Sequence, residues 1–592
     1  MNRRVGAVCS TIRSQLSKEW TVYALLSLLV AALWITRLQG PIDLRWDGGV
    51  YYVLGTSLAE GKGYRLLNEP GEIEAVQYPP LFPLIVSAHQ WILGSDNPLV
   101  VGQWLRIFSC VVFSLYAAAV FRVLQCCLSQ AMALVGTTIC LFQMSTYFLS
   151  DLLFPELLYG LITTVFILYA HQRERRDGIV GAALLASAAF GLKTVGIALF
   201  AAWVTEELLN KNVKQFIVRC AIVAIPVLCW QMYLASVISG SEYLQPAYDY
   251  QRAPYMFYNV SYVNNVFTFK DPFRPELGLT STQDMATRLV TNLGHLPESI
   301  GESVSAPRTF YELPWKMVRM PFPIATTWPV DVALFILSGL VLGGIGLHLR
   351  DRQWITPLYV IFYLGALCLT PWPEQIGRYL MPLIPFLVVF LLTTLSALST
   401  LPGRWRQVTS VSKWLVVVLI LVLQGSTYWG VQTWGHPLVT HMDLNGAPVR
   451  YRLFFYRDAH RALDAGLDWV QEHAKSTDVL AGSMPHWMYL RTKLKAVMPP
   501  FESDPAKAQA LLDSVPVTYL FLDEGLAVDT KQYTASVVRL YSDRWERVYV
   551  DSIAPERPGD PPGQFEIYRR LQPTDVFSTG VTNRPADIHA HP

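Results

Sequence analysis

The sequence predicts an α-helical polytopic membrane protein with a small extracytoplasmic α/β domain near its C-terminal end. Of its 592 residues, 52% are hydrophobic and only 16% are charged. Several apolar runs reach the roughly 20 residues that a helix needs to cross a bilayer. From about Asp458 the composition changes to the alternation of polar and apolar residues that is typical of a soluble domain.

Net charge and cysteine usage argue against nucleic-acid binding and against a zinc site or structural disulfide outside the membrane. The formal net charge of +2, without a basic patch interleaved with aromatic residues, argues against a nucleic-acid partner. The eight cysteines lie in the N-terminal tail or in and beside apolar segments, and they show neither zinc-type spacing nor a CxxC motif. We therefore expect no structural disulfide outside the membrane.

The apolar runs and the basic loops between them predict spans and orientation together, because lysine and arginine collect in cytoplasmic loops. We expect eleven transmembrane helices, the N-terminus in the cytoplasm and the C-terminal domain outside. The first is interpreted as uncleaved, because no small-residue cleavage site follows it. The expected spans cover about 20–38, 99–124, 131–149, 157–170, 178–191, 195–209, 216–237, 329–348, 355–370, 379–398 and 412–431.

These spans divide the chain into three parts. Residues 1–435 form the membrane domain, with external loops at 39–98 and 238–326. Residues 436–571 form the α/β domain, and 572–592, which lack an apolar period, are expected to be disordered. Within the α/β domain, strands are predicted at DVLAGS, KAVM, VTYLFLDE and WERVYVD, and helices at Asp464–His473 and Pro505–Ser514. His473 and His486 are interpreted as ordinary surface residues.

The first external loop has more organisation than a linker needs. Asp47 opens a helical pattern whose apolar residues share one side, so its carboxylate is expected at the N-terminus of a helix lying along the membrane. Those apolar residues are Val50, Tyr51, Leu54 and Leu58. Gly61 and Gly63 end this helix, and Tyr78-Pro79-Pro80 starts a second one. The alternative is that Asp47 only caps its helix.

Further ionisable residues stand at the external ends of the spans, where a charge costs roughly 2.5–3.5 kcal/mol at membrane depth and usually has a partner or a function. They are Asp151, Glu156, Lys193 and Arg378. A carboxylate can take a proton from an attacking hydroxyl, while lysine and arginine stabilise a departing phosphate. This combination favours glycosyl transfer. The alternative is that these side chains are interfacial anchors or solvate helix ends.

Several motifs occur together in a characteristic order over residues 20–400. Asp47 precedes a Val-Tyr-Tyr helix and a Gly-Tyr turn; Tyr78 begins Tyr-Pro-Pro-Leu-Phe-Pro; Ser-Asp follows at 150–151; Arg378 begins Arg-Tyr-Leu-Met-Pro-Leu-Ile-Pro. In this order the chain resembles the GT-C membrane glycosyltransferases. The branch it most resembles holds the protein O-mannosyltransferases, which use dolichyl phosphate mannose, and the lipid A aminoarabinose transferases, with many bacterial relatives.

The resemblance implies the GT-C fold and an inverting transfer of a sugar from a polyprenyl-phosphate donor to an acceptor hydroxyl on a protein, lipid or polysaccharide. It also implies an integral protein of a bacterial inner (plasma) membrane, working in cell-envelope glycosylation. Asp47 matches the first-loop catalytic acid, the general base. Asp151 matches the second-loop catalytic acid, with Glu156 as a possible helper at the donor site.

By the same resemblance, Lys193, Arg378 and Tyr379 would hold the lipid phosphate, and Tyr78 would line the donor site. The chain departs from the family pattern at two positions. Gly48 stands where relatives often have a second acid, which puts a metal-assisted mechanism in doubt, although a divalent metal is not excluded. Gln77 stands where relatives often have lysine, which removes one candidate phosphate contact.

Two other functions remain open at this stage. A transporter or flippase of lipid-linked sugars also places charges near spans, but transporters tend to show paired repeats and broken helices at the midplane, which this sequence lacks. A non-catalytic assembly scaffold would leave the elaborate first loop unexplained. The tyrosines of the 238–326 loop could pack onto the membrane domain or offer aromatic faces to an acceptor.

Overall fold

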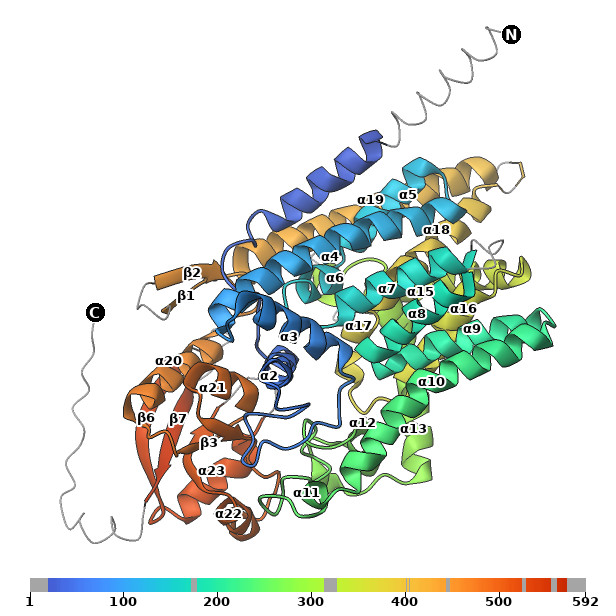
Figure 1. Ribbon diagram of the computed structural model, residues 1–592. Coiled ribbons are helices and arrows are strands. Elements are labelled where there is room, and N and C mark those ends of the chain that lie inside the picture. Colours follow the sequence, from blue (N-terminus) through green and yellow to red (C-terminus); the bar gives the residue numbers. More distant parts are fainter. Residues whose placement is uncertain are drawn as a thin grey trace.

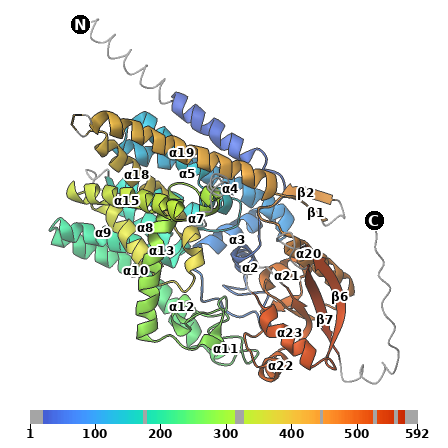
Figure 2. The ribbon, with the colours of Figure 1, turned by 180° about the vertical axis from the view of Figure 1, so that it is seen from behind.

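The computed structural model describes residues 20–171, 178–312, 327–400, 402–403, 405–442, 448–523, 529–554 and 562–571. Long apolar helices lie side by side, and the α/β domain packs against one end of them (Figure 1). Seen from behind, the short helices α11 (Ser241–Leu244) and α12 (Tyr262–Thr268) lie at that same end (Figure 2).

Each of the eleven predicted spans contains a helix. The helices are Trp20–Trp34, α4 (Pro98–Cys127), α5 (Gln130–Phe142) with α6 (Met144–Leu149), α7 (Glu156–His171), α8 (Gly178–Leu192), α9 (Ile197–Leu209), α10 (Val213–Ile238), α15 (Trp328–Arg350), α16 (Ile355–Leu367), α17 (Ile376–Tyr379) with α18 (Ile384–Leu398), and α19 (Trp405–Trp434). By length and composition, five helical stretches of the described chain can cross a membrane by themselves: α4, α10, α15, 373–398 and α19. Most of the others are shorter apolar helices, so the span count and the orientation stay predictions.

Close helix packing depends on small residues at particular positions. Gly344 of α15 faces α18, and a Cβ built on it would lie 2.2 Å from the carbonyl oxygen of Phe390. Glycine therefore lets the two backbones approach, as is common between membrane helices. Gly346 lies two residues further along α15, and a Cβ built on it would have no atom within 4 Å.

The loops between the spans hold further short helices. They are α2 (Asp47–Ala59), α3 (Leu81–Leu93), η1 (Thr194–Gly196), α11 (Ser241–Leu244), α12 (Tyr262–Thr268), η2 (Pro275–Leu277), α13 (Thr282–Ser303), η3 (Pro373–Gln375) and η4 (Met381–Leu383). The longest, α13, begins with a capping box in which Ser281 and Asp284 bind each other's backbone amides.

The first loop folds as predicted in its elements but not in its exposure. Helix α2 begins at Asp47, Gly61 and Gly63 follow it with φ of 71° and 88°, and α3 begins directly after Pro80. The sequence pattern implied one apolar side, whereas residues 48–57 of α2 are all buried. The reason is that α3 covers α2 from one side and α21 (Pro485–Thr492) of the C-terminal domain contacts it as well.

The C-terminal domain is built on a five-stranded mixed sheet of order β4-β3-β5-β7-β6. Strands β3, β4 and β5 are parallel, and β7 pairs antiparallel with both β5 and β6. A separate hairpin joins the domain to α19. The elements are β1 (Leu438–Met442), β2 (Pro448–Arg452), α20 (Asp458–His473), β3 (Val479–Ala481), α21, β4 (Lys495–Val497), α22 (Pro505–Asp513), β5 (Val517–Leu522), α23 (Lys531–Leu540), β6 (Trp545–Ile553) and β7 (Gly563–Arg570).

All four predicted strands and both predicted helices of this domain are present. Strands β1, β2 and β7 and helices α21 and α23 were not predicted, although Phe565 and Ile567 of β7 alternate with polar residues and are fully buried. The expected disordered tail, 572–592, lies outside the described residues.

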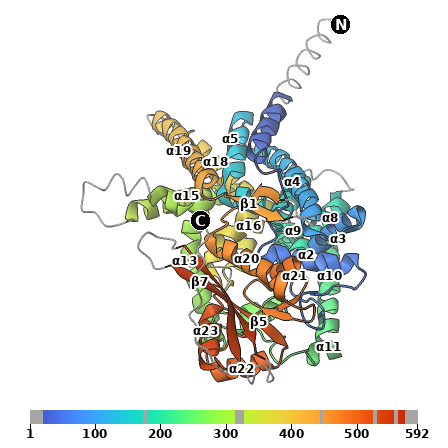
Figure 3. The same ribbon diagram turned by 90° about the vertical axis from the view of Figure 1, so that its left-hand side faces the viewer.

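The carboxyl ends of the parallel strands face the first loop. Helix α21 follows β3 and contacts α2, and Figure 3 shows α21 between the sheet and the helix bundle. Beside it, the Ala496 amide of β4 donates a hydrogen bond of 2.8 Å to the Asn68 carbonyl, and the Asn68 side-chain amide returns one of 3.0 Å. The domain is thereby joined to the loop that carries Asp47.

Candidate functional site

Four charged side chains from four separate elements meet at the end of the helix bundle that carries the C-terminal domain. Asp47 is the first residue of α2, Glu156 the first of α7, Lys193 precedes η1, and Arg378 lies in α17. Arg378 Nη2 donates to Asp47 Oδ2 at 2.6 Å, and Arg378 Nε donates to Glu156 Oε1 at 3.2 Å. Lys193 Nζ binds the same Glu156 oxygen at 2.9 Å. We call these four residues the charged cluster.

Glu156 is the centre of the charged cluster. Its side chain is fully buried, whereas the side chains of Lys193 and Arg378 keep 18% and 24% of their surface exposed. Its second oxygen, Oε2, has no hydrogen-bond partner among the described residues. Two carboxylates and two cations balance, so the cluster can form in a region of low permittivity without a bound ion.

Aromatic rings flank the two cations. The Arg378 guanidinium lies 4.3 Å from the ring centroid of Phe154 and 5.7 Å from that of Tyr379, and Lys193 Nζ lies 5.5 Å from Tyr379. Such contacts favour a cation over a ring face. The Tyr363 hydroxyl donates to the Tyr379 carbonyl at 2.9 Å, which fixes the backbone beside Arg378. Tyr379 thus lies beside both cations, where the sequence analysis expected it.

Tyr258, which the sequence analysis did not single out, holds the other oxygen of Asp47. Its hydroxyl donates to Asp47 Oδ1 at 3.2 Å. Burial, with the charge of Asp47 as a further cause, raises the pKa of Tyr258 well above its ordinary value, so the phenol stays protonated and can donate. The Asp47 carboxylate accepts hydrogen bonds from Arg378 and Tyr258, and the N-cap residue of α2 is Trp46. The alternative that Asp47 only caps α2 is therefore wrong.

Tyr78 lies in the first loop beside Asp47. Its ring centroid is 4.9 Å from that of Tyr51, which in turn packs edge-on against Phe82 at 5.1 Å. Burial raises the pKa of Tyr78 well above its ordinary value, and the nearby Asp47 charge contributes. The side chain is thus a neutral phenol on the first-loop side of the charged cluster.

Asp151 is not part of the charged cluster, contrary to its expected role as the second acid. It is buried and binds Arg37 at 3.3 Å and Arg106 at 3.1 Å. Arg106 also donates to the carbonyl of Arg452, beside the start of the C-terminal domain. Glu156, which the resemblance implied as a possible helper, is the second acid of the charged cluster.

A short backbone bridge between the first and second external loops explains why Glu156, and not Asp151, meets Arg378. The Asp43 amide donates to the Asp151 carbonyl at 3.2 Å, and the Leu153 amide donates to the Asp43 carbonyl at 2.9 Å, so that Asp43 pairs in parallel with Leu152. Asp47 lies four residues after Asp43, and Glu156 lies four residues after Leu152. The bridge therefore brings these two acids to the same place.

The bridge also accounts for the glycine at position 48. A Cβ at this position would lie 3.2 Å from the Asp43 carbonyl oxygen and 3.4 Å from the Leu153 Cβ. A larger side chain would press the two loops apart, so glycine fits the close approach of the loops.

The residues of the charged cluster do not fit a divalent metal ion. Among the described residues, no three His, Cys, Asp or Glu side chains are grouped to hold one. Divalent cations prefer several oxygen ligands, whereas Asp47 and Glu156 are each bound to Arg378. A metal bound here would have to displace that guanidinium.

His486 lies beside the charged cluster and is not a surface residue, contrary to expectation. It is 3% exposed, and its ring packs edge-on against Tyr258 with centroids 4.6 Å apart. The expectation failed because only the fold brings α21 against α2. His473 is exposed, as expected.

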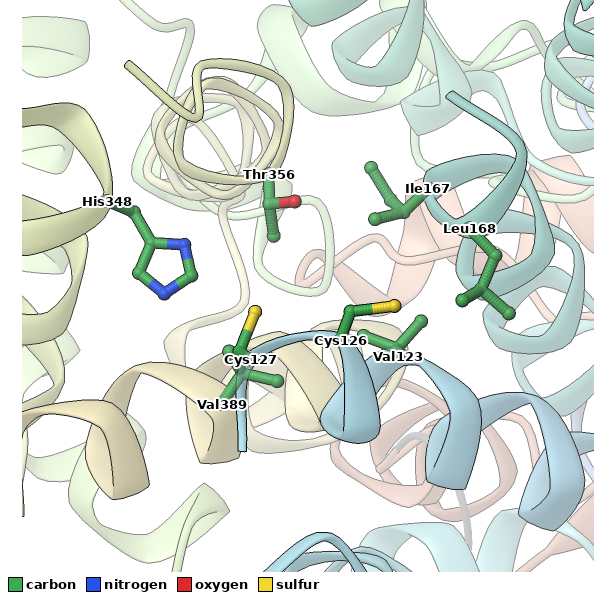
Figure 4. A pocket seen from close by; sticks show the side chains of 8 residues that line it. All are labelled: Val123, Cys126, Cys127, Ile167, Leu168, His348, Thr356 and Val389. Atoms are coloured by element: carbon green, nitrogen blue, oxygen red, sulfur yellow. The ribbon is translucent and has the colours of Figure 1, made fainter. Parts of the chain in front are cut away.

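A pocket of about 10 Å³ lies elsewhere in the bundle, at the far end of α4 (Figure 4). A cavity of this size is just large enough to hold one water molecule. It shares no residue with the charged cluster. The lining side chains are Val123, Cys126, Cys127, Ile167, Leu168, His348, Thr356 and Val389.

No protein-family profile and no curated protein sequence matches the chain. Solved structures do. The Archaeoglobus fulgidus oligosaccharyltransferase in complex with Zn and sulfate aligns with a TM-score of 0.50 and 12% identity, over 92% of this chain and 72% of its own. ArnT from Cupriavidus metallidurans bound to undecaprenyl phosphate aligns at 0.48 and 11%, over 93% and 98%. Archaeal AglB from Archaeoglobus fulgidus, with an inhibitory peptide and a dolichol-phosphate, aligns at 0.49 and 11%, over 94% and 75%.

The alignment at a TM-score of 0.50 extends over most of both chains. The chain has the GT-C fold of integral membrane proteins, with a small C-terminal α/β region, as the sequence predicts.

Proposed function

We propose that this protein is an inverting glycosyltransferase that moves a sugar from a polyprenyl-phosphate donor to an acceptor hydroxyl on the extracytoplasmic face of the membrane. The observation that carries the proposal is the charged cluster, in which Asp47 and Glu156 both bind Arg378 and Glu156 also binds Lys193. It combines a candidate base with two cations for a phosphate. The shared fold with an oligosaccharyltransferase supports the same reading.

The reaction divides between the two kinds of group. Asp47 takes the proton of the acceptor hydroxyl while the acceptor oxygen forms a bond to the anomeric carbon. The bond from that carbon to the phosphate oxygen breaks on the opposite face, which inverts the configuration. The leaving polyprenyl phosphate gains one negative charge, and Lys193 and Arg378 stabilise it.

The ion pairs within the charged cluster support an order of events. Asp47 and Arg378 neutralise each other at 2.6 Å, so a donor phosphate that binds Arg378 competes with Asp47 for the guanidinium. Its arrival releases Asp47 Oδ2 to face the acceptor hydroxyl. Glu156 stays bound to both cations and holds them on the same side chain. The donor thus activates the base.

The position of the charged cluster also separates this function from transport. Its residues stand at the ends of helices, beside the C-terminal domain, whereas secondary transporters place their sites at the midplane in broken helices. The acceptor remains a protein, lipid or polysaccharide hydroxyl.

The test uses membranes that contain the wild type or Asp47→Asn, supplied with a panel of radiolabelled polyprenyl-phosphate sugars. We expect label to pass to an acceptor with the wild type only, because losing the base costs about 10²- to 10⁴-fold. Asp351→Asn is the matched control, because Asp351 is exposed at the far end of α15. Equal transfer by wild type and Asp47→Asn contradicts the proposal.

A further inference from the structure

His486 reaches the catalytic end of the molecule from the C-terminal domain. It is the second residue of α21, which packs onto the first turn of α2. A Cβ built on Gly49 of α2 would lie 3.0 Å from the His486 Cβ and 3.4 Å from the Trp487 amide nitrogen. The glycine two residues after Asp47 therefore leaves the space that α21 occupies.

The same end of the domain holds the polar loop that supplies Tyr258. His486 follows β3 and packs on Tyr258, while Phe501 follows β4 and stacks on Tyr255, with centroids 5.4 Å apart and planes 18° apart. Open α/β sheets bind ligands at the carboxyl ends of their parallel strands. In this protein that edge is occupied by the part of the polar loop that carries Tyr255 and Tyr258, which lies between the domain and the charged cluster.

A histidine at this position is not explained by stability. Its Nε2 is buried and has no hydrogen-bond partner among the described residues. Leaving such a buried group unpaired destabilises the folded state. Burial lowers the pKa of His486 to about 3, so the ring is neutral and adds no cation near Arg378. What the ring does provide is a flat edge-to-face contact, with planes at 81°, to the phenol that binds Asp47.

We propose that His486 is a positioning residue of the glycosyl-transfer site, which holds the Tyr258 phenol in the orientation that donates to Asp47. The C-terminal domain is thereby part of the reacting centre and not only a cap or an acceptor-binding module. The inference rests on the proposed function. It assigns the contact path His486 to Tyr258 to Asp47, in which only Asp47 touches the acceptor.

The test compares His486→Leu, which fills the volume without a ring, with His486→Phe, which keeps the ring. Both are measured for kcat and for the KM of the donor in the full-length membrane enzyme, with His473→Leu as the control for an exposed histidine of the same domain. We expect His486→Leu to lose about tenfold or more in kcat with KM changed less than about twofold, because misplaced catalytic groups lower kcat. His486→Phe and the control should stay within about threefold of wild type.

Coupling to Tyr258 is read from a double variant. Tyr258→Phe removes the hydrogen bond to Asp47 and should lose about as much kcat as His486→Leu. Combining the two should cause no further loss. If the two losses multiply, if His486→Phe is as poor as His486→Leu, or if the loss falls on KM, the positioning role is wrong while the glycosyltransferase stands. If the wild type itself transfers no sugar, the proposed function fails, and this inference fails with it.

Discussion

Arg378 Nη2 donates a hydrogen bond of 2.6 Å to Asp47 Oδ2 and joins two residues that are 331 positions apart in the chain. The same guanidinium binds Glu156 through Nε. One planar cation therefore sets the distance between the two acids of the charged cluster. A phosphate can replace Asp47 on it without disturbing Glu156, because different nitrogens are used.

Arg378→Lys should lower kcat/KM for the donor by about 100-fold. Lysine keeps the charge but is a single point that cannot hold Asp47 and Glu156 in a fixed plane. Arg350→Lys is the control, since the Arg350 side chain is 71% exposed at the far end of α15. Initial transfer rates over a range of donor concentrations measure the effect. Wild-type kinetics in Arg378→Lys would show that transfer does not depend on a planar guanidinium that binds Asp47 and Glu156 through different nitrogens.

Asp151→Asn should act on stability and not on the chemical step. Asp151 is buried against Arg37 and Arg106, and breaking a buried ion pair by removing one partner costs on the order of 3–5 kcal/mol. We expect a clearly lower Tm in detergent, with the kcat of the surviving folded enzyme within a few-fold of wild type. Asp543→Asn, at an exposed position, serves as the control. A normal Tm with lost kcat would return Asp151 to a catalytic role.

Gly344→Ala should destabilise the helix bundle, whereas Gly346→Ala should not. The added Cβ at 344 meets the Phe390 backbone at 2.2 Å, and overpacking typically costs about 1–3 kcal/mol. The Cβ at 346 meets nothing within 4 Å. Thermal unfolding of the two purified variants makes the comparison. Equal Tm values would mean that α15 and α18 are not in contact at Gly344.

The C-terminal domain should lose stability as the pH falls below about 6.5. Burial lowers the pKa values of His436 to about 3, of His460 to about 2 and of His486 to about 3, from an ordinary value of 6.5. The unfolded chain therefore binds protons below pH 6.5 that the folded chain does not, so the stability contribution is complete above 6.5 and is lost as the pH falls toward 3.

His486→Phe isolates one share of this effect. Its Tm should fall less than that of wild type between pH 7.5 and pH 5, because it lacks one of the three groups, while His473→Phe should follow wild type. Thermal unfolding at fixed ionic strength gives both curves. Parallel curves for wild type and His486→Phe would show that His486 is not held neutral by the fold.

Much of the fold could be predicted because membrane helices are visible in the sequence as long apolar runs. A run of apolar residues forces helical structure in lipid, since each backbone group must be paired within its own segment. The charged residues at helix ends, Asp47, Lys193 and Arg378, stand out for the same reason. In the structure Asp47 pairs with Arg378, and Lys193 joins them through Glu156, while the catalytic roles of these residues stay proposals.

The site was incompletely predicted where long-range pairing decides. Asp151 and Glu156 are five residues apart, and only the bridge between Asp43 and Leu152 determines which of them meets Arg378. Tyr258 is one of several tyrosines in its loop, and its contact with Asp47 spans 211 positions. His486 depends on the docking of a whole domain. None of these relations leaves a local period in the sequence.

The bridge between Asp43 and Leu152 fixes the starting point of two chain segments, each of which leads to an acid of the charged cluster. Each loop runs four residues from the paired position to its acid, so an insertion or deletion in 44–46 or 153–155 would carry one carboxylate past Arg378. Variation in loop length should therefore be tolerated elsewhere, for example at the Gly61 and Gly63 turn, where open space surrounds both residues. Libraries that vary these loops must keep the number of residues from Asp43 to Asp47 and from Leu152 to Glu156, and they must keep Gly61 and Gly63, whose φ of 71° and 88° favours glycine.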